Sequence, residues 1–160
     1  MRITALMAAT LSMGLVAGVF GLYAHTIMPG LARTDDRTFV GAFQSIDRAI
    51  INPWFMAGGF LGALLFTVLA ALAYIGRPAL PWIVAALVLY AITVVITLVV
   101  NVPLNDAIKA AGNPGHIDVA AVREAFDEMR WRGWNLVRVI ASTTAFGLLA
   151  WALTLSGTSG

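Results

Sequence analysis

Cysteine is missing from the 160-residue chain, and charged residues are few. Without cysteine the chain can supply no disulfide, no thiolate ligand for a metal or an iron–sulfur cluster, and no thiol redox chemistry. Charged residues make up 11% of the sequence, whereas an ordinary soluble domain has about a quarter. Hydrophobic residues reach 60%, and the mean hydropathy is +0.87. The composition therefore excludes an ordinary water-soluble domain and predicts a membrane protein.

Several kinds of functional site are also missing from the sequence. The formal net charge is only +2, which is too small an excess to indicate nucleic-acid binding. The two histidines, His25 and His116, lie far apart in the sequence, so we expect neither a metal centre nor a haem held by two histidines of one chain. No glycine-rich phosphate loop and no Ser-His-Asp set stand out. We expect no dedicated metal centre, no haem, and neither hydrolase nor kinase activity.

Formal charge is absent from four stretches of the chain, which are residues 3–32, 49–76, 78–105 and 139–160. Each stretch exceeds the roughly 20 apolar residues that a helix needs to cross the hydrocarbon of a bilayer. The predicted fold is an all-α, integral membrane four-helix bundle with up-down-up-down topology. The expected spans lie at about 3–27, 53–76, 81–101 and 133–155. Together they form a single transmembrane domain over residues 1–160.

The predicted connections between the spans are unequal in length. Two long loops, 28–52 and 102–132, lie on one side of the membrane and contain all eight acidic residues. The opposite side has only Arg2, one tight turn and the C-terminal tail. Asp118 fits the N-cap of a last helix that begins near residue 119 and projects beyond the bilayer. We therefore expect the polar chemistry on the side of the two long loops.

Polar and aromatic side chains gather at the loop-side ends of all four predicted spans. Up-down-up-down topology brings these ends to one membrane face, so residues that are far apart in sequence can line a common chamber. The candidates for catalysis are His25, Asn101, Asn105, Asn135 and Arg138. The candidates for substrate binding are Asn52, Trp54, Trp131 and Trp134. Asn52 also precedes Pro53, a pair that fits a helix N-cap followed by proline at the first helical position.

Arg138 stands about one turn deeper in the fourth span than Trp134. An arginine at mid-bilayer costs roughly 2.5–3.5 kcal/mol on insertion scales, so an inward-facing Arg138 needs an acceptor or a bound anion. The spacing Trp131-x-x-Trp134-Asn135-x-x-Arg138 predicts that these four side chains form one stripe along the helix. The alternative is an interfacial aromatic belt with Arg138 reaching up to the lipid head groups. The sequence leaves both interpretations open.

Pro103 lies in the middle of the segment 101–105, whose sequence is NVPLN. Within a helix, Pro103 leaves the carbonyl of Val99 without its usual donor, and near a membrane that carbonyl needs another one. The side-chain amides of Asn101 and Asn105 can supply the missing donor. The alternative is a plain helix end with polar caps.

Several of these features resemble the anthrone-oxygenase-like family of small four-helix integral membrane proteins, much of which is a domain family of unknown function. The features are the four-span layout, Met28-Pro29-Gly30-Leu31, the segment 101–105 and Trp134-Asn135-x-x-Arg138. The resemblance covers about residues 5–155. The activities assigned in this family, in fungi, are oxidations of polyketide anthrones to anthraquinones.

The resemblance implies a membrane-embedded, cofactor-independent oxygenase for a lipophilic aromatic substrate of the anthrone or quinol type. In this interpretation His25, which can exchange a proton near neutral pH, takes the substrate proton. Arg138 and the three candidate asparagines stabilise the oxyanion, and Trp131 and Trp134 stack on the fused rings. The partners implied are the lipid bilayer and a lipophilic aromatic small molecule, and the expected location is the inner membrane of a bacterium.

Two non-catalytic interpretations stay open. In one, the chain is an accessory subunit of a larger membrane complex, and its polar residues only satisfy helix ends. In the other, it binds a lipophilic, quinone-like molecule without turnover. Gly14-x-x-x-Gly18 permits a homo-oligomer, but it serves helix packing within one chain equally well. The sequence alone determines neither the membrane orientation nor the natural substrate.

Overall fold

The computed structural model describes residues 2–157 and is built from helices and turns, with no strand in that range. This confirms the all-α prediction. Four stretches are long and apolar enough to cross a membrane, and the chain is therefore an integral membrane protein. The stretches are Arg2–Leu31, Trp54–Ala73, Leu80–Ala110 and Val119–Ser156.

Within residues 2–157, α-helices alternate with three short π-helical segments that carry the label η. In chain order the elements are α1 (Arg2–Leu22), η1 (Tyr23–Ile27), α2 (Met28–Leu31), α3 (Asp36–Ile50), η2 (Trp54–Phe60), α4 (Leu61–Ala73), α5 (Leu80–Ile96), η3 (Thr97–Asn101), α6 (Val102–Ala110), α7 (Val119–Phe126) and α8 (Glu128–Gly157). Each of the first three membrane stretches thus contains one π segment.

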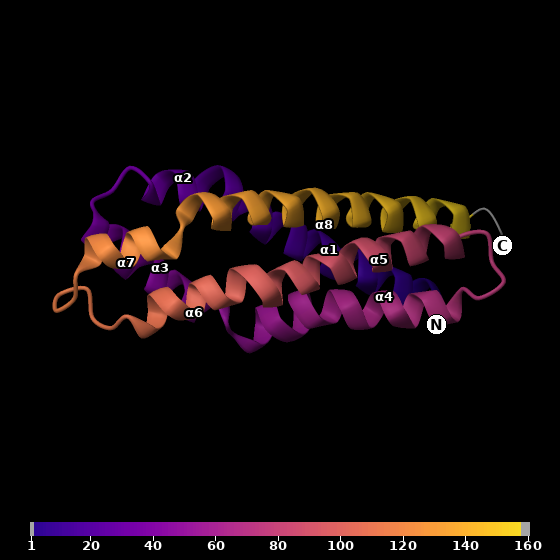
Figure 1. Cartoon of the computed structure of the whole chain (residues 1–160). Helices are drawn as coiled ribbons and strands as arrows, with labels where there is room; N and C mark the ends of the chain where they lie inside the picture. The colour runs from indigo at the N-terminus through magenta and orange to yellow at the C-terminus, as the bar shows by residue number, and fades with distance from the viewer. Residues whose placement is uncertain (1, 158–160) are drawn as a thin grey trace.

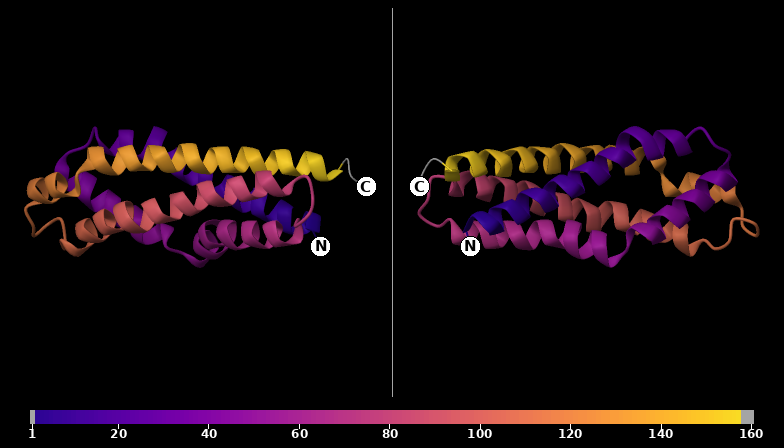
Figure 2. Two further views of the ribbon diagram at one scale, coloured as in Figure 1. Left: turned by 45° about the vertical axis from the view of Figure 1, so that its right-hand side comes forward. Right: turned by 180° about the vertical axis from the view of Figure 1, so that it is seen from behind.

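The molecule is elongated, and α1, α4, α5 and α8 run along its length (Figures 1 and 2). Each of these helices packs against two of the others, in the order α1, α4, α5, α8 and back to α1. The faces that meet carry a continuous apolar core, which includes Leu6, Met13, Ile83 and Leu149. Both termini lie at one end of the molecule, and α3, α6 and α7 lie at the other (Figure 1).

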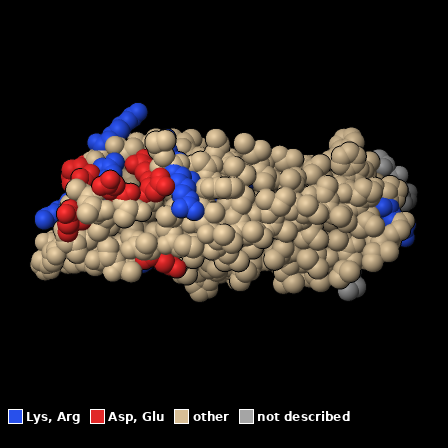
Figure 3. All heavy atoms as spheres, in the orientation of Figure 1, with Lys and Arg blue, Asp and Glu red and all other residues tan. Residues whose placement is uncertain are grey.

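Charged side chains gather at the end formed by α3, α6 and α7 (Figure 3). A broad surface without acidic or basic atoms follows, and a smaller basic group marks the opposite end. Large apolar side chains such as Leu11, Leu65, Val88 and Ile140 are exposed on α1, α4, α5 and α8. The uncharged belt is the surface that fits the hydrocarbon of a bilayer, because exposed apolar side chains need no water there.

The two long connections expected as loops are largely helical, and α3 is a fifth substantial helix. Its buried residues Phe39, Val40 and Phe43 recur at helical spacing and pack into a second apolar cluster with Phe126 of α7. Asp35 caps the helix, and the hydroxyl and amide of Thr38, which donate to its carboxylate, lower the pKa of Asp35. The helix is amphipathic, and charged residues such as Arg37 and Arg48 on its exposed face lower the mean hydropathy of this region.

The three π segments lie where membrane stretches meet the charged end. Each is closed by a backbone amide that donates to the carbonyl five residues back, namely Met28 to Tyr23, Leu61 to Met56 and Val102 to Thr97. Prolines stand beside all three, at positions 29, 53 and 103. Because proline offers no amide hydrogen, Pro29 and Pro103 interrupt the regular ladder of hydrogen bonds, whereas Pro53 lies at the start of its helix, where no such bond is lost. All three bulges contribute residues to one cavity.

Gly62 gives a direct test of the η2 bulge. A Cβ atom at Gly62 would lie 2.5 Å from the carbonyl oxygen of Ala57, whereas a Cβ at Gly58 would meet nothing within 4 Å. We expect Gly62→Ala to lower the free energy of unfolding by about 1–3 kcal/mol, as overpacking does. Gly58→Ala, the matched control, leaves it unchanged or slightly higher. Equal unfolding curves for both variants in detergent micelles would contradict this packing.

Candidate functional site

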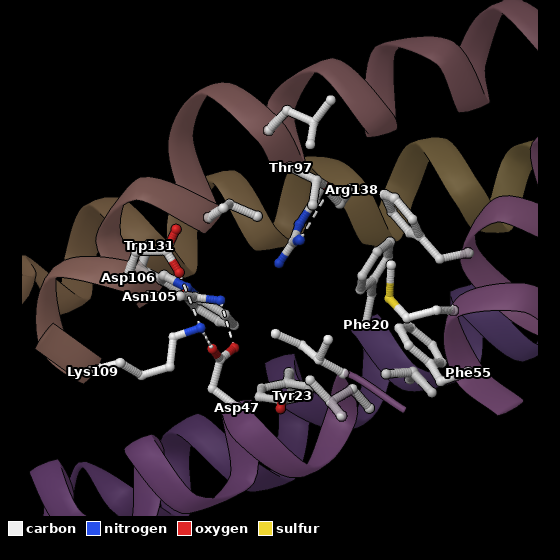
Figure 4. A pocket seen from close by; sticks show the side chains of 17 residues that line it. Phe20, Tyr23, Asp47, Phe55, Thr97, Asn105, Asp106, Lys109, Trp131 and Arg138 are labelled. Atoms are coloured by element: carbon white, nitrogen blue, oxygen red, sulfur yellow. Dashed lines mark hydrogen bonds and ion pairs between the residues drawn. The ribbon is translucent and has the colours of Figure 1, made fainter. Parts of the chain in front are cut away.

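A cavity of about 190 Å³ lies where the membrane stretches meet the charged end (Figure 4). We call it the junction cavity. Its walls come from α1, η1, α3, η2, η3, α6 and α8, and most of the lining is apolar. The apolar lining includes Val19, Phe20, Ile50, Ile51, Phe55, Met56, Phe60, Leu98 and Val102. The polar lining consists of Tyr23, Asp47, Thr97, Asn105, Asp106, Lys109, Trp131 and Arg138.

All three π segments border the junction cavity. Tyr23 comes from η1, Phe55 and Phe60 from η2, and Thr97 from η3. An extra residue in a helical turn shifts the side chains that follow it and opens space between neighbouring helices. Such bulges occur frequently at functional sites. Their position around one cavity marks this region as the candidate site.

Arg138 is the buried charge of the junction cavity, with 4% of the residue exposed. Its guanidinium donates to the hydroxyl of Thr97 at 3.2 Å and to the side-chain carbonyl of Asn135 at 2.8 Å, and its Nε has no partner. The guanidinium carbon lies 4.3 Å from the ring centre of Phe20 and 5.5 Å from that of Trp131. Among residues 2–157 no carboxylate forms an ion pair with it.

Arg138 has the features of an anion-binding residue, because its guanidinium is buried beside the cavity and its Nε has no hydrogen-bond partner. Neutral acceptors and aromatic faces satisfy part of the guanidinium, and no carboxylate lies within ion-pair distance of it in the described residues. A buried cation is costly unless it is paired. A bound oxyanion at this place would supply the missing charge and a strong, charge-assisted hydrogen bond.

Two of the predicted site residues, Asn135 and Asn101, lie next to the cavity without lining it. Asn135 is fully buried, donates to the backbone carbonyl of Phe20 at 3.1 Å and accepts from Arg138. Asn101 donates to the backbone carbonyl of Trp131 at 3.3 Å, and its side-chain oxygen is buried without a partner. Neither side chain lines the cavity. Asn135 therefore orients the guanidinium, and Asn101 ties η3 to α8.

Asp47 forms the second polar centre, at the other side of the cavity (Figure 4). Its carboxylate accepts from the side-chain amide of Asn105 at 2.7 Å and pairs with the ammonium of Lys109 at 2.7 Å. Lys109 also pairs with Asp106, at 3.0 Å. Asn105 in turn accepts from the indole of Trp131 at 2.6 Å. The four side chains and the indole form one continuous polar network from the cavity to the surface.

Tyr23 and Trp131 are the aromatic residues of the polar lining, and Phe43 packs behind Trp131. The ring of Trp131 lies 5.7 Å from that of Tyr23 and meets Phe43 edge-on at 5.8 Å. Trp131 itself is almost fully buried. Its hydrogen bond to Asn105 and its contact with the Arg138 guanidinium fix the plane of the indole. A flat aromatic ligand can stack on such a surface.

The structure thus brings Asn105, Trp131 and Arg138 together, but it places His25 elsewhere. His25 is exposed, its Nδ1 lies 2.6 Å from the hydroxyl of Thr26, and it does not line the cavity. The expectation that it faces the common chamber is wrong, because the buried face of α1 continues from Phe20 to Tyr23, three residues later, and His25 lies off that face. His116 is also exposed. Within the described part of the chain no group of three or more His, Asp or Glu is placed to hold a metal ion.

The other tryptophans and Asn52 also lie outside the cavity. Trp134 is 41% exposed and Trp54 is 69% exposed. Trp134 does not line the cavity that Trp131 and Arg138 line, so the predicted single stripe is wrong for this residue. Both exposed indoles fit the interfacial belt instead. Asn52 caps η2, because its side-chain oxygen accepts from the amide of Phe55 at 2.9 Å.

The Asn101 and Asn105 amides bond to partners other than the one predicted. They donate to the Trp131 carbonyl and to Asp47 respectively, and not to the carbonyl of Val99. The π turn of η3 accommodates Pro103 by moving the backbone bond to the fifth residue. The asparagine side chains are therefore free to join neighbouring helices.

Sequence reasoning missed Asp47, Lys109 and Phe20. A signal for Asp47 was present, since it follows Phe39, Val40, Phe43 and Gln44 on the buried face of α3. A carboxylate in phase with an apolar stripe indicates a buried, paired acid. Lys109 lies four residues after Asn105 and so shares its helix face. Phe20 had no signal of its own, because many apolar residues occupy the first span.

Comparison with known proteins identifies one family. The sequence pattern of the family described as anthrone oxygenase matches residues 50–148. The matched part includes Asn105, Lys109, Trp131 and Arg138, and begins just after Asp47. Searches of curated proteins and of solved structures gave no match. The family match agrees with the resemblance found in the sequence.

Proposed function

Because the chain belongs to the anthrone oxygenase family, we propose that it is a membrane-embedded oxygenase for a lipophilic aromatic ketone of the anthrone type. In the proposed reaction, one anthrone and one dioxygen give one anthraquinone and one water. The methylene carbon between the two aryl rings becomes the second carbonyl. We propose that this reaction takes place in the junction cavity.

The observation that carries the proposal is the unpaired Arg138 guanidinium beside an apolar space. Loss of a methylene proton turns anthrone into an electron-rich phenolate, whose negative charge lies largely on the ketone oxygen. A guanidinium held in place before the reaction stabilises that oxygen most strongly where water is excluded. Arg138, oriented by Asn135 and Thr97, is placed for this role.

The remaining lining suits the rings of such a substrate. Phe20 and Trp131 flank the guanidinium, so a tricyclic anion bonded to Arg138 can lie against aromatic faces. Ile51 and Leu98 line the cavity and are also exposed on the outer surface. They mark a route through which a lipophilic molecule can pass from the bilayer, which agrees with the apolar character of ligand sites.

No resident cofactor takes part in the proposed reaction. The phenolate transfers electrons to dioxygen directly, and the resulting peroxide at the former methylene carbon loses water to give the ketone. The work left to the protein is to generate the anion, hold it and exclude water. We further propose that the chain resides in the inner membrane of a bacterium, since the outer membrane holds β-barrels.

Oxygen labelling tests the proposal. Purified protein in detergent micelles is mixed with anthrone under ¹⁸O₂, and oxygen uptake, anthraquinone absorbance and product mass are followed against protein-free micelles. We expect one dioxygen consumed per anthrone and one labelled oxygen in the quinone, at a rate well above the uncatalysed one. Binding of anthrone without accelerated uptake would refute the oxygenase and identify a carrier.

A further inference from the structure

We infer that Asp47 is the base that removes the methylene proton of the substrate. The inference rests on the proposed function and adds a residue that the family match does not reach, since the match begins at residue 50. It also replaces His25, whose exposed position separates it from the junction cavity.

Elimination among the cavity residues leads to Asp47. The carboxylates that line the cavity are Asp47 and Asp106. The side chain of Asp106 is 63% exposed, whereas that of Asp47 is 7% exposed. Lys109 is held as an ammonium between the two, so it has no lone pair to offer. A base that acts on a molecule inside an apolar cavity must itself be buried with the substrate, and Asp47 meets this condition.

The neighbours of Asp47 hold it ready for proton transfer. Lys109 and Asn105 bind its two oxygens, and the indole of Trp131 fixes Asn105 from behind. Arg138 lines the same cavity without an ion pair to Asp47. A substrate whose ketone oxygen meets Arg138 therefore places its opposite ring carbon, the methylene, on the side of Asp47 (Figure 4).

Asp47 alone can carry out every proton transfer that the reaction requires. Asp47 takes a methylene proton, and the electron pair of the broken C–H bond stays on the substrate as the phenolate. After dioxygen adds to that carbon, Asp47 returns the proton to the peroxide oxygen. It then removes the second hydrogen from the carbon while the O–O bond breaks, and the departing hydroxide takes that proton to become water. Dioxygen is the oxidant, and the enzyme is left unchanged.

Hydrogen exchange without oxygen isolates the first of these steps. Anthrone is incubated with the full-length protein in D₂O buffer under nitrogen, and deuterium at the methylene carbon is measured by mass spectrometry. We expect deuterium exchange to be faster with the wild type than in protein-free micelles. In Asp47→Asn we expect the protein-catalysed exchange rate to fall by roughly 100-fold or more, which is the contribution typical of a general base. Asp36→Asn, on the same helix and paired with Arg123, is the matched control and keeps the wild-type rate.

A second variant guards against misfolding. Asp47→Glu keeps a carboxylate at this place and is expected to retain exchange well above that of Asp47→Asn. Exchange by Asp47→Asn at the wild-type rate would overturn the assignment of Asp47, and so would equal loss in the Asn and Glu variants. Oxygen uptake by the wild type in air is measured separately. If uptake occurs but Asp47→Asn exchanges at the wild-type rate, only the assignment of the base is wrong. If the wild type takes up no oxygen, the proposed oxygenase activity is refuted.

Discussion

Arg138→Gln is expected to lower kcat/KM for anthrone oxidation about 100- to 1,000-fold, the usual effect of removing an oxyanion donor. The change removes a buried cation that has no carboxylate partner. Lys109, the other cation of the junction cavity, is already paired with Asp47 and cannot take its place. The measurement is initial oxygen uptake over a range of anthrone concentrations.

Two companion variants separate chemistry from folding in this experiment. Arg138→Lys keeps the charge but loses the planar, forked guanidinium, so we expect an intermediate rate. Arg132→Gln alters an exposed arginine on the same helix, paired with Glu128 at 3.3 Å, and should leave the rate unchanged. A kcat/KM for Arg138→Gln close to that of Arg132→Gln would show that Arg138 takes no part in the reaction.

Asn135→Leu is expected to cost about 3 kcal/mol in the free energy of unfolding. The fully buried amide joins the Phe20 carbonyl to the Arg138 guanidinium. Leucine is of similar size but leaves both of those groups without this partner, and unsatisfied buried groups cost about 1–3 kcal/mol each, more when charged. The check is reversible unfolding in mixed micelles.

The control for this change is Ser142→Ala on the same helix. The Ser142 hydroxyl bonds only to carbonyls of its own helix, those of Arg138 and Val139. Without the hydroxyl, those carbonyls still lie within the helical backbone. We therefore expect Ser142→Ala to lower the free energy of unfolding by much less than Asn135→Leu does. An equal decrease in the free energy of unfolding for the two variants would mean that the hydrogen bonds of Asn135 between α1 and α8 do not contribute to stability.

The membrane stretches could be predicted because charge is excluded from hydrocarbon regardless of how the helices pack. Charge-free windows locate all four stretches, and topology then brings Asn105, Trp131 and Arg138 to one level, as the structure shows. The sequence leaves the direction of Arg138 open between the bundle interior and the lipid head groups, and the structure places it inward.

The rest of the site depends on which face each helix turns inward, and average hydropathy does not report this. The buried face of α1 continues from Phe20 to Tyr23, so Tyr23 and not His25 lines the cavity. Trp134 is a second case, because the stripe spacing predicts that it faces the chamber, whereas its indole is 41% exposed and does not line the cavity. Asp47 lies in a segment that its charge predicts to be a polar loop, although its apolar residues recur at helical spacing.

The meeting of a substrate oxyanion with Arg138 is tested most directly by comparing two ligands that cannot be oxidised in this way. Anthracene-9-carboxylate and anthracene-9-carboxamide share their rings and differ in charge, and their affinities can be measured by calorimetry in micelles. We expect wild type to bind the carboxylate roughly tenfold more tightly than the amide, and Arg138→Gln to lose that preference. A preference of equal size in both proteins would contradict the anion site.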